Sequence, residues 1–112
     1  MRVGHGVAEI PVPAGSRMGG YADRRGASTG TADPLEAHVV TITDGGHTLA
    51  LVVLDLVCVN VDLAAAVRAA VPADDVWVCA THTHSGPEAG CVPGGSVTPR
   101  PWLSVVRSEA HV

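Results

Sequence analysis

The clearest hydrophobic pattern runs from residue 36 to residue 57, where two β-rich stretches flank Asp44-Gly45-Gly46. Asp-Gly and Gly-Gly pairs supply the positive φ angles that tight hairpin turns need. The pattern therefore predicts an antiparallel pair of strands at about 36–43 and 47–57. The second stretch, HTLALVVLDLV, is apolar at nearly every position, which is typical of a strand that is buried on both faces.

A strand is expected before this pair and a helix after it. Residues 3–10 (VGHGVAEI) alternate in part between apolar and polar, and Pro11 ends the stretch. Asn60 suits the N-cap of a helix that Pro72 stops. Several side chains of this helix can share one face or its border: Val61, Ala64, Ala65, Val67, Arg68 and Val71.

Residues 74–81 (DDVWVCAT) form another short apolar stretch, directly after the predicted helix. A strand, a helix and a strand in succession favour a crossover that leaves the two strands parallel. The sequence thus predicts an α/β fold, with a β-hairpin plus a βαβ unit in a mixed sheet and at least one crossover helix. After Gly90 the sequence shows no regular spacing of hydrophobic residues, so residues 91–112 are expected to be an irregular tail.

Composition and charge argue against several classes of function. A length of 112 residues suits one small domain, and an aromatic content of 3% leaves a core of Val, Leu, Ile and Ala. The net charge is −4 and no basic cluster stands out, which argues against nucleic acid as a partner. No apolar run reaches the roughly 18–20 residues of a membrane helix. The N-terminus lacks a secretory signal, so a cytoplasmic protein is expected, with Cys58, Cys79 and Cys91 as reduced thiols.

The stretch VWVCATHTHSGPEAG (76–90) carries the strongest candidate chemistry. Residues two apart in an extended strand point to the same face, so His82 and His84 are expected to project together from the carboxyl end of a strand. Ligands of open α/β sheets bind at that edge, and imidazole nitrogen suits zinc. The alternative is that both histidines are polar residues that cap the strand.

Three further residues near this stretch have two interpretations each. Ser85 is either a nucleophile or a turn residue before Gly86-Pro87, and Glu88 is either a ligand or base or a solvated loop carboxylate. Asp55 interrupts an apolar stretch, so it either orients a metal-binding histidine or lies at the strand end in water. His5, His38 and His47 are scattered along the chain and are interpreted as ordinary surface or strand residues.

Three motifs in order resemble one family: RMGGYA (17–22), LVVLDL (51–56) and THTHSGP (81–87). Over Val3 to about Gly90 the chain is similar to the N-terminal portion of the neutral/alkaline, non-lysosomal ceramidases and their bacterial relatives. That family hydrolyses the N-acyl amide bond of ceramide in an α/β catalytic domain that holds one zinc ion. The resemblance implies a lipid amide, or another small N-acyl compound, as the substrate.

The resemblance also implies roles for individual residues. His82 matches a zinc ligand, and His84 matches a catalytic residue beside the metal that contacts water or substrate. Gly20 and Tyr21 fall in a loop that lines the substrate entrance, and Asp55 matches a supporting acidic residue. The spacing of the histidines alone allows both to bind metal, whereas the family pattern assigns metal binding to His82 only.

The chain departs from the family at two points. Glu88-Ala89-Gly90 stands where the family has Gly-Gly-Tyr, which favours an amidase-like relative over a ceramidase proper. The family's other zinc ligands, a histidine, a glutamate and a tyrosine, lie well downstream. Residues 1–90 are therefore expected to be the first portion of a larger catalytic domain, with 91–112 a truncated or frame-shifted tail. The missing partner is then the remainder of that domain or an oligomer partner.

Two other readings of the sequence remain. A small non-catalytic module that binds metal or a partner, completed by oligomerisation, would explain the absent ligands. Other hydrolases with an HxH motif fit less well, because metallo-β-lactamase-like enzymes place Asp and His after it, where this chain has Ser85-Gly86. Barrel amidohydrolases carry the motif on their first strand, whereas at least three strands are expected before it here.

Overall fold

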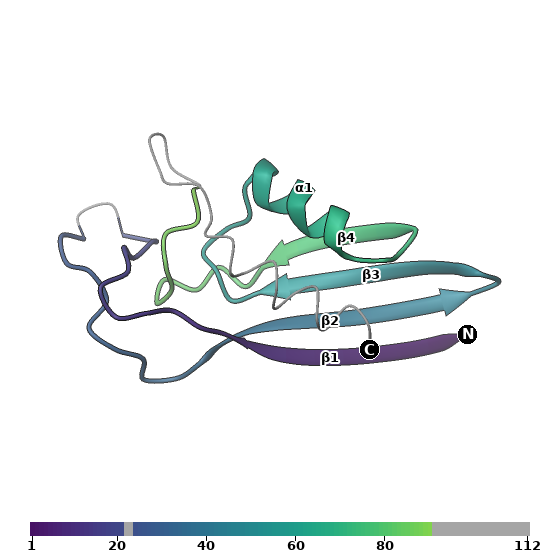
Figure 1. The fold of residues 1–112 in the computed structure, drawn as a ribbon, viewed down its shortest axis with the longest axis horizontal. Coiled ribbons are helices and arrows are strands. Elements are labelled where there is room, and N and C mark those ends of the chain that lie inside the picture. Colours follow the sequence, from purple (N-terminus) through teal and green to yellow (C-terminus); the bar gives the residue numbers. More distant parts are fainter. Residues whose placement is uncertain (22–23, 91–112) are drawn as a thin grey trace.

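A computed structural model of the chain describes residues 1–21 and 24–90. These residues form a four-stranded mixed sheet in the order β1-β2-β3-β4, with one helix along it (Figure 1). The elements are β1 (Arg2–Ile10), β2 (Leu35–Asp44), β3 (His47–Leu54), α1 (Val61–Ala70) and β4 (Asp75–Ala80). The predicted α/β class and mixed sheet are confirmed, while the predicted tail at 91–112 lies outside the described residues.

The hairpin forms as the turn residues predict. β2 and β3 pair antiparallel up to Asp44 and His47, and the two residues between them, Gly45 and Gly46, have φ angles of 58° and 80°. Positive φ at both central residues is the requirement of a two-residue type I′ turn, which glycine meets without strain. β1 pairs antiparallel with β2 along its whole length and ends at Ile10, before Pro11.

The predicted crossover is also confirmed, because β3 and β4 pair parallel and α1 connects them. The Asn60 side chain caps α1 by accepting a hydrogen bond from the Leu63 amide at 2.7 Å. The predicted helical face is wrong at its start, since Val61 is 83% exposed and Leu63 is buried. Leu63, Val67 and Val71 are spaced four residues apart, so they form the stripe that meets the sheet.

Only one face of the sheet is buried. In β3 the alternate residues Ala50, Val52 and Leu54 belong to the core, which α1 covers. The intervening side chains are only partly buried: Leu49, Leu51 and Val53. The expectation that β3 is buried on both faces is therefore wrong, because the part of the chain that the structure describes places a helix on one face alone. No helix among these residues is long and apolar enough to cross a membrane.

Candidate metal centre

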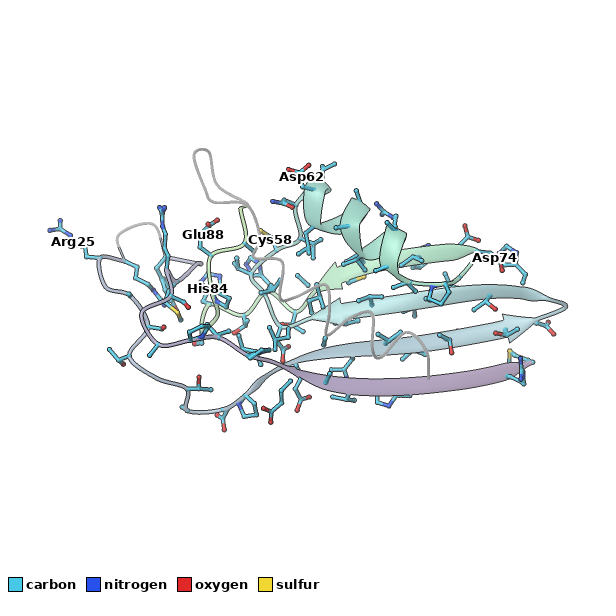
Figure 2. All side chains as sticks on the ribbon, in the orientation of Figure 1. Arg25, Cys58, Asp62, Asp74, His84 and Glu88 are labelled. Atoms are coloured by element: carbon cyan, nitrogen blue, oxygen red, sulfur yellow. The ribbon has the colours of Figure 1, made fainter. Side chains whose placement is uncertain are left out.

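The candidate site lies at the edge of the sheet where β3 and β4 both end. Figure 2 shows His84, Glu88 and Cys58 gathered beyond the carboxyl ends of these two strands. Two backbone hydrogen bonds hold the chain after β4 against the end of β3 and the residues that follow it. They run from the Thr81 amide to the Leu54 carbonyl and from the His82 amide to the Leu56 carbonyl, each 3.0 Å long. The site is thus built where parallel strands present their ligand-binding end.

His82 has a left-handed backbone and a fixed ring. Its φ angle is 67°, and it is the one residue other than glycine with positive φ in the described part of the chain. Its Nδ1–H donates to the Val57 carbonyl oxygen, with the two atoms 2.6 Å apart. Because a neutral imidazole carries one proton, this hydrogen bond leaves the Nε2 lone pair available for a metal or a donor.

His84 meets His82 through the same nitrogen. The two Nε2 atoms are 3.2 Å apart, and the rings meet nearly edge to face at an interplanar angle of 72°. With the His82 tautomer fixed, His84 Nε2–H donates to His82 Nε2. The expected convergence of the two rings is found, but its expected cause is not. β4 ends at Ala80, and the left-handed turn at His82, rather than strand periodicity, brings the rings together.

The two nitrogens fit part of a zinc site. Two imidazole nitrogens that bind one tetrahedral zinc at about 2.05 Å lie about 3.3 Å from each other. The observed 3.2 Å separation is compatible with that distance and equally with a hydrogen bond between the two rings. The Val57 carbonyl fixes the His82 ring in the way that backbone carbonyls fix metal-binding imidazoles. Within residues 1–21 and 24–90, no group of three or more His, Cys, Asp or Glu side chains is placed to hold a metal ion. A catalytic zinc needs about three protein ligands, so the described residues alone do not complete such a site.

The loop that follows β1 holds His84 from the other side. Gly20 has φ 103°, and a Cβ atom there would lie 2.8 Å from Cγ of His84, so only glycine fits. The Tyr21 ring meets the His84 ring edge to face, with centroids 4.9 Å apart. Arg24 Nη2 donates to the His84 carbonyl oxygen at 2.9 Å, and its guanidinium lies 5.1 Å from the centre of the Tyr21 ring. His84 is therefore held by backbone, ring and cation contacts at once.

A cavity of about 590 Å³ opens between this loop and the His82 ring. It is lined by Arg17, Met18, Gly19, Gly20, Tyr21, Arg24, Val57, Cys58, His82 and Glu88. The loop residues Gly20 and Tyr21, expected at a substrate entrance, thus line a cavity next to the candidate ligand. Sequence reasoning did not select Arg24 or Val57. Arg24 lies just past the RMGGYA motif, which could have drawn attention to it. Val57 contributes its backbone carbonyl, which any residue has, so the sequence gives no signal for this contact.

Asp55 anchors the backbone next to the site. Its Oδ2 accepts a hydrogen bond from the Glu36 amide at 2.9 Å, and its Oδ1 accepts one from the Thr81 hydroxyl at 3.1 Å. The carboxylate therefore ties the start of β2 to the residue that precedes His82. It supports the position of the histidine through the chain.

Glu88 and Ser85 have different surroundings. Glu88 is only 8% exposed, accepts a hydrogen bond from the Gly90 amide and lines the cavity, so the expectation of a solvated carboxylate is wrong. Its backbone amide donates to the Arg17 carbonyl, which ties this segment to the first loop. The Ser85 amide donates to the Thr83 hydroxyl at 3.1 Å, a local turn contact of the kind expected before Gly86-Pro87.

Three other histidines, His5, His38 and His47, lie on strands, as expected. His5 Nε2 and His38 Nδ1 are 3.3 Å apart on neighbouring strands, and His38 Nε2–H donates to the Glu36 carboxylate at 2.7 Å. His47 lies at the start of β3, where its ring donates to the Asp75 carboxylate at 2.7 Å. That hydrogen bond raises the pKa of the exposed His47 imidazole above 6.5.

The cysteines differ from one another. Cys58, which lines the cavity, is disulfide-bonded, so the expectation of reduced thiols is wrong at this residue. Cys79 is a free, exposed thiol on β4, and Cys91 lies outside the described residues. A disulfide is typical of oxidising compartments, which bears on where the protein works.

Comparison with known proteins adds no family assignment. No family model matches the chain, and no curated protein or solved structure matches it significantly. The resemblance to ceramidases therefore rests on the three motifs and stays a hypothesis.

Proposed function

We propose that this chain contributes to a zinc-dependent hydrolase that cleaves an N-acyl amide bond, such as that of a ceramide-like lipid. The observation that carries the proposal is the His82–His84 pair, whose Nε2 atoms lie 3.2 Å apart at the ligand-binding end of a parallel strand pair. The adjacent cavity of about 590 Å³ offers space for an acyl compound beside the pair.

Each residue has a part in this proposal. His82 holds the zinc through Nε2, with its ring oriented by the Val57 carbonyl. Zinc would supply Lewis-acid polarisation of the amide carbonyl and a water of lowered pKa. His84 positions that water or donates a hydrogen bond to the tetrahedral oxyanion. Gly20 and Tyr21 keep His84 in place beside His82.

The remaining ligands come from outside the described residues under this proposal. The single ligand His82 falls short of the three ligands of a catalytic zinc site, so the fragment by itself is expected to be inactive. The substrate is a lipid amide or another small N-acyl compound, and the missing groups lie in a longer protein or a partner chain. A cytoplasmic location stays a prediction, and the disulfide at Cys58 counts against it.

A zinc titration by calorimetry tests the first half of the proposal. We expect binding that His82→Ala abolishes and that His84→Ala weakens about 10- to 100-fold, the range for a residue that orients a ligand. His47→Ala, at the opposite end of β3, is the matched control and should bind as the unaltered chain does. Unchanged zinc binding in His82→Ala would refute the role of His82 as a metal ligand.

Hydrolysis tests the second half. A longer protein that contains this chain should release fatty acid from an N-acyl sphingosine or a simpler N-acyl amide, and His82→Ala should abolish the release. Unchanged hydrolysis in that variant would refute the enzymatic proposal even if zinc binds.

The alternative is a non-catalytic metal-binding or interaction module completed by oligomerisation. It is favoured by the absence, within residues 1–21 and 24–90, of a group of three or more His, Cys, Asp or Glu side chains placed to hold a metal ion. It predicts one zinc ion for two chains, with ligation by His82 of each. The stoichiometry from the same titration separates the two proposals.

A further inference from the structure

The cavity beside the His82 ring carries two guanidinium groups. Arg17 and Arg24 belong to the loop that follows β1, and both line the cavity of about 590 Å³ that His82 also lines. Glu88 is the one acidic side chain among the described residues that line it. Two formal positive charges therefore meet one negative charge here, although the whole chain has a net charge of −4. A cavity with an excess of one charge attracts ligands of the opposite charge.

Neither guanidinium is paired with an acidic side chain within the described parts of the chain. The close pairs of basic and acidic groups there are those of the N-terminal amine, His38 and His47 with nearby carboxylates. The Glu88 carboxylate accepts a hydrogen bond from the Gly90 amide. The positive charge of the loop is therefore available to an anionic ligand in the cavity.

Arg24 is held in one position at the wall of the cavity. It is half-buried, its Nη2 donates to the His84 carbonyl oxygen at 2.9 Å, and its Cζ lies 5.1 Å from the centre of the Tyr21 ring. A guanidinium has five N–H donors, so this hydrogen bond leaves most of them for a ligand. Arg17 is exposed, but its backbone is fixed because its carbonyl oxygen accepts a hydrogen bond from the Glu88 amide at 2.8 Å. The two cations are thus presented to the cavity by a loop that is itself tied down.

We propose that Arg17 and Arg24 bind an anionic oxygen group, a carboxylate or a phosphate, on the acyl compound that this cavity accepts. The planar donor fork of arginine matches both groups. The apolar part of the compound lies against Met18, Tyr21 and Val57, which line the same cavity. The ligand is then a charged N-acyl amide, such as an N-acyl amino acid, rather than a neutral ceramide-like lipid. The identity of the amide rests on the proposed function, whereas the preference for an anion rests on the two arginines.

Calorimetric titration of the 112-residue chain in EDTA tests the preference for an anion. N-octanoylglycine, which carries a carboxylate, is compared with neutral N-octanoylglycinamide, which has the same acyl chain. We expect the carboxylate to bind about 10- to 100-fold more tightly, as for hydrogen bonds to a charged group. The phosphate ester of N-octanoylethanolamine, compared with N-octanoylethanolamine itself, shows which of the two anionic groups binds better.

Variants of the arginines separate anion binding from a structural role. Arg24→Gln should lower the preference for the carboxylate about tenfold, and Arg17→Gln about threefold, because solvent screens the exposed Arg17. An Arg24 that only held the His84 backbone would weaken the binding of both compounds equally, so the ratio of the two affinities is the readout. Arg25→Gln is the control, because Arg25 is exposed and points away from the site (Figure 2), and it should leave the ratio unchanged. Circular dichroism confirms that each variant is folded.

Three results would overturn the proposal. They are equal affinities for the charged and neutral compounds, no binding of either, or a preference for the carboxylate that both Arg24→Gln and Arg17→Gln leave intact. Because EDTA removes zinc, the outcome does not depend on hydrolysis. A preference that the arginine variants lose would support the anion site even if a longer protein hydrolyses no amide, and equal affinities would refute the site even if hydrolysis occurs.

Discussion

Gly20 is the residue whose replacement should reveal how the first loop controls His84. A Cβ atom at Gly20 would lie 2.8 Å from Cγ of His84 and 3.0 Å from its Cα. The 2.8 Å contact is shorter than carbon atoms in proteins approach one another, and the 3.0 Å contact, which involves the backbone, is tighter than most. Rotating the His84 side chain therefore cannot relieve the overlap, so Gly20→Ala has to push the loop and the His84 backbone apart.

The expected loss of folding stability in Gly20→Ala has two causes, backbone strain and steric overlap. Alanine variants of two other glycines distinguish these causes. The φ angle of 103° at Gly20 makes alanine about 1–2 kcal/mol unfavourable through backbone strain. The overlap adds about 1–3 kcal/mol, as for an overpacked site. Gly15 has φ 89° and open space around it, so Gly15→Ala carries the strain alone. Gly26 has open space and no positive φ, so Gly26→Ala should lie within about 0.5 kcal/mol of the unaltered chain.

Urea unfolding and zinc titration together provide the assay. The difference between Gly20→Ala and Gly15→Ala measures the overlap and should be about 1–3 kcal/mol in the free energy of unfolding. Gly20→Ala should also weaken zinc binding about tenfold or more, since it moves His84, whereas Gly15→Ala should not. Equal stability of these two variants would show that the loop does not contact His84. It would refute the conclusion that the loop holds this side chain in place.

Two more variants probe groups at the two ends of β3. The Asp75 carboxylate raises the pKa of His47, so the protonated imidazole stabilises the fold fully below pH 6.5, and this contribution is lost as the pH rises through the raised pKa. Melting temperatures from about pH 5.5 to about pH 8.5 should show that loss in the unaltered chain and a flatter profile in His47→Gln, and identical profiles would contradict the ion pair. Asp55→Ala leaves the Glu36 amide and the Thr81 hydroxyl without their acceptor, and should lower the free energy of unfolding by about 1–3 kcal/mol. Asp55→Asn should recover part of that loss in the same urea titration, and an Asp55→Ala variant as stable as the unaltered chain would rule out the anchoring role.

Local signals in the sequence were sufficient to predict the elements of the fold. The Gly45-Gly46 turn fixes the hairpin because both residues need positive φ, and the Asn60 cap fixes where α1 begins. Burial could not be predicted in the same way. An apolar strand such as β3 shows how much surface could be buried, but the neighbouring elements decide how much is buried. With α1 on one face only among the described residues, β3 leaves its other apolar face outward.

In the candidate site, too, the sequence predicted which residues meet but not the backbone conformation that brings them together. The HxH pattern identified the two side chains, but strand periodicity gave the wrong reason for their convergence. His82 lies outside the strand at φ 67°, a conformation that costs a residue with a side chain about 1–2 kcal/mol. That cost has to be offset by the contacts that fix it, which are the amide hydrogen bond to Leu56 and the ring hydrogen bond to Val57.

Strain of this kind persists where the surroundings hold a residue in one position, and such positions cluster at functional sites. Both partners of His82 are backbone carbonyls of the chain after β3, so they do not depend on the side chains of Leu56 and Val57. What is specific to histidine is the outcome, a fixed Nδ1–H that leaves Nε2 directed at the nitrogen of His84. A strand cap would need neither the left-handed turn nor the meeting of two nitrogens, and this difference is the structural reason to prefer a metal ligand at His82 over a polar cap.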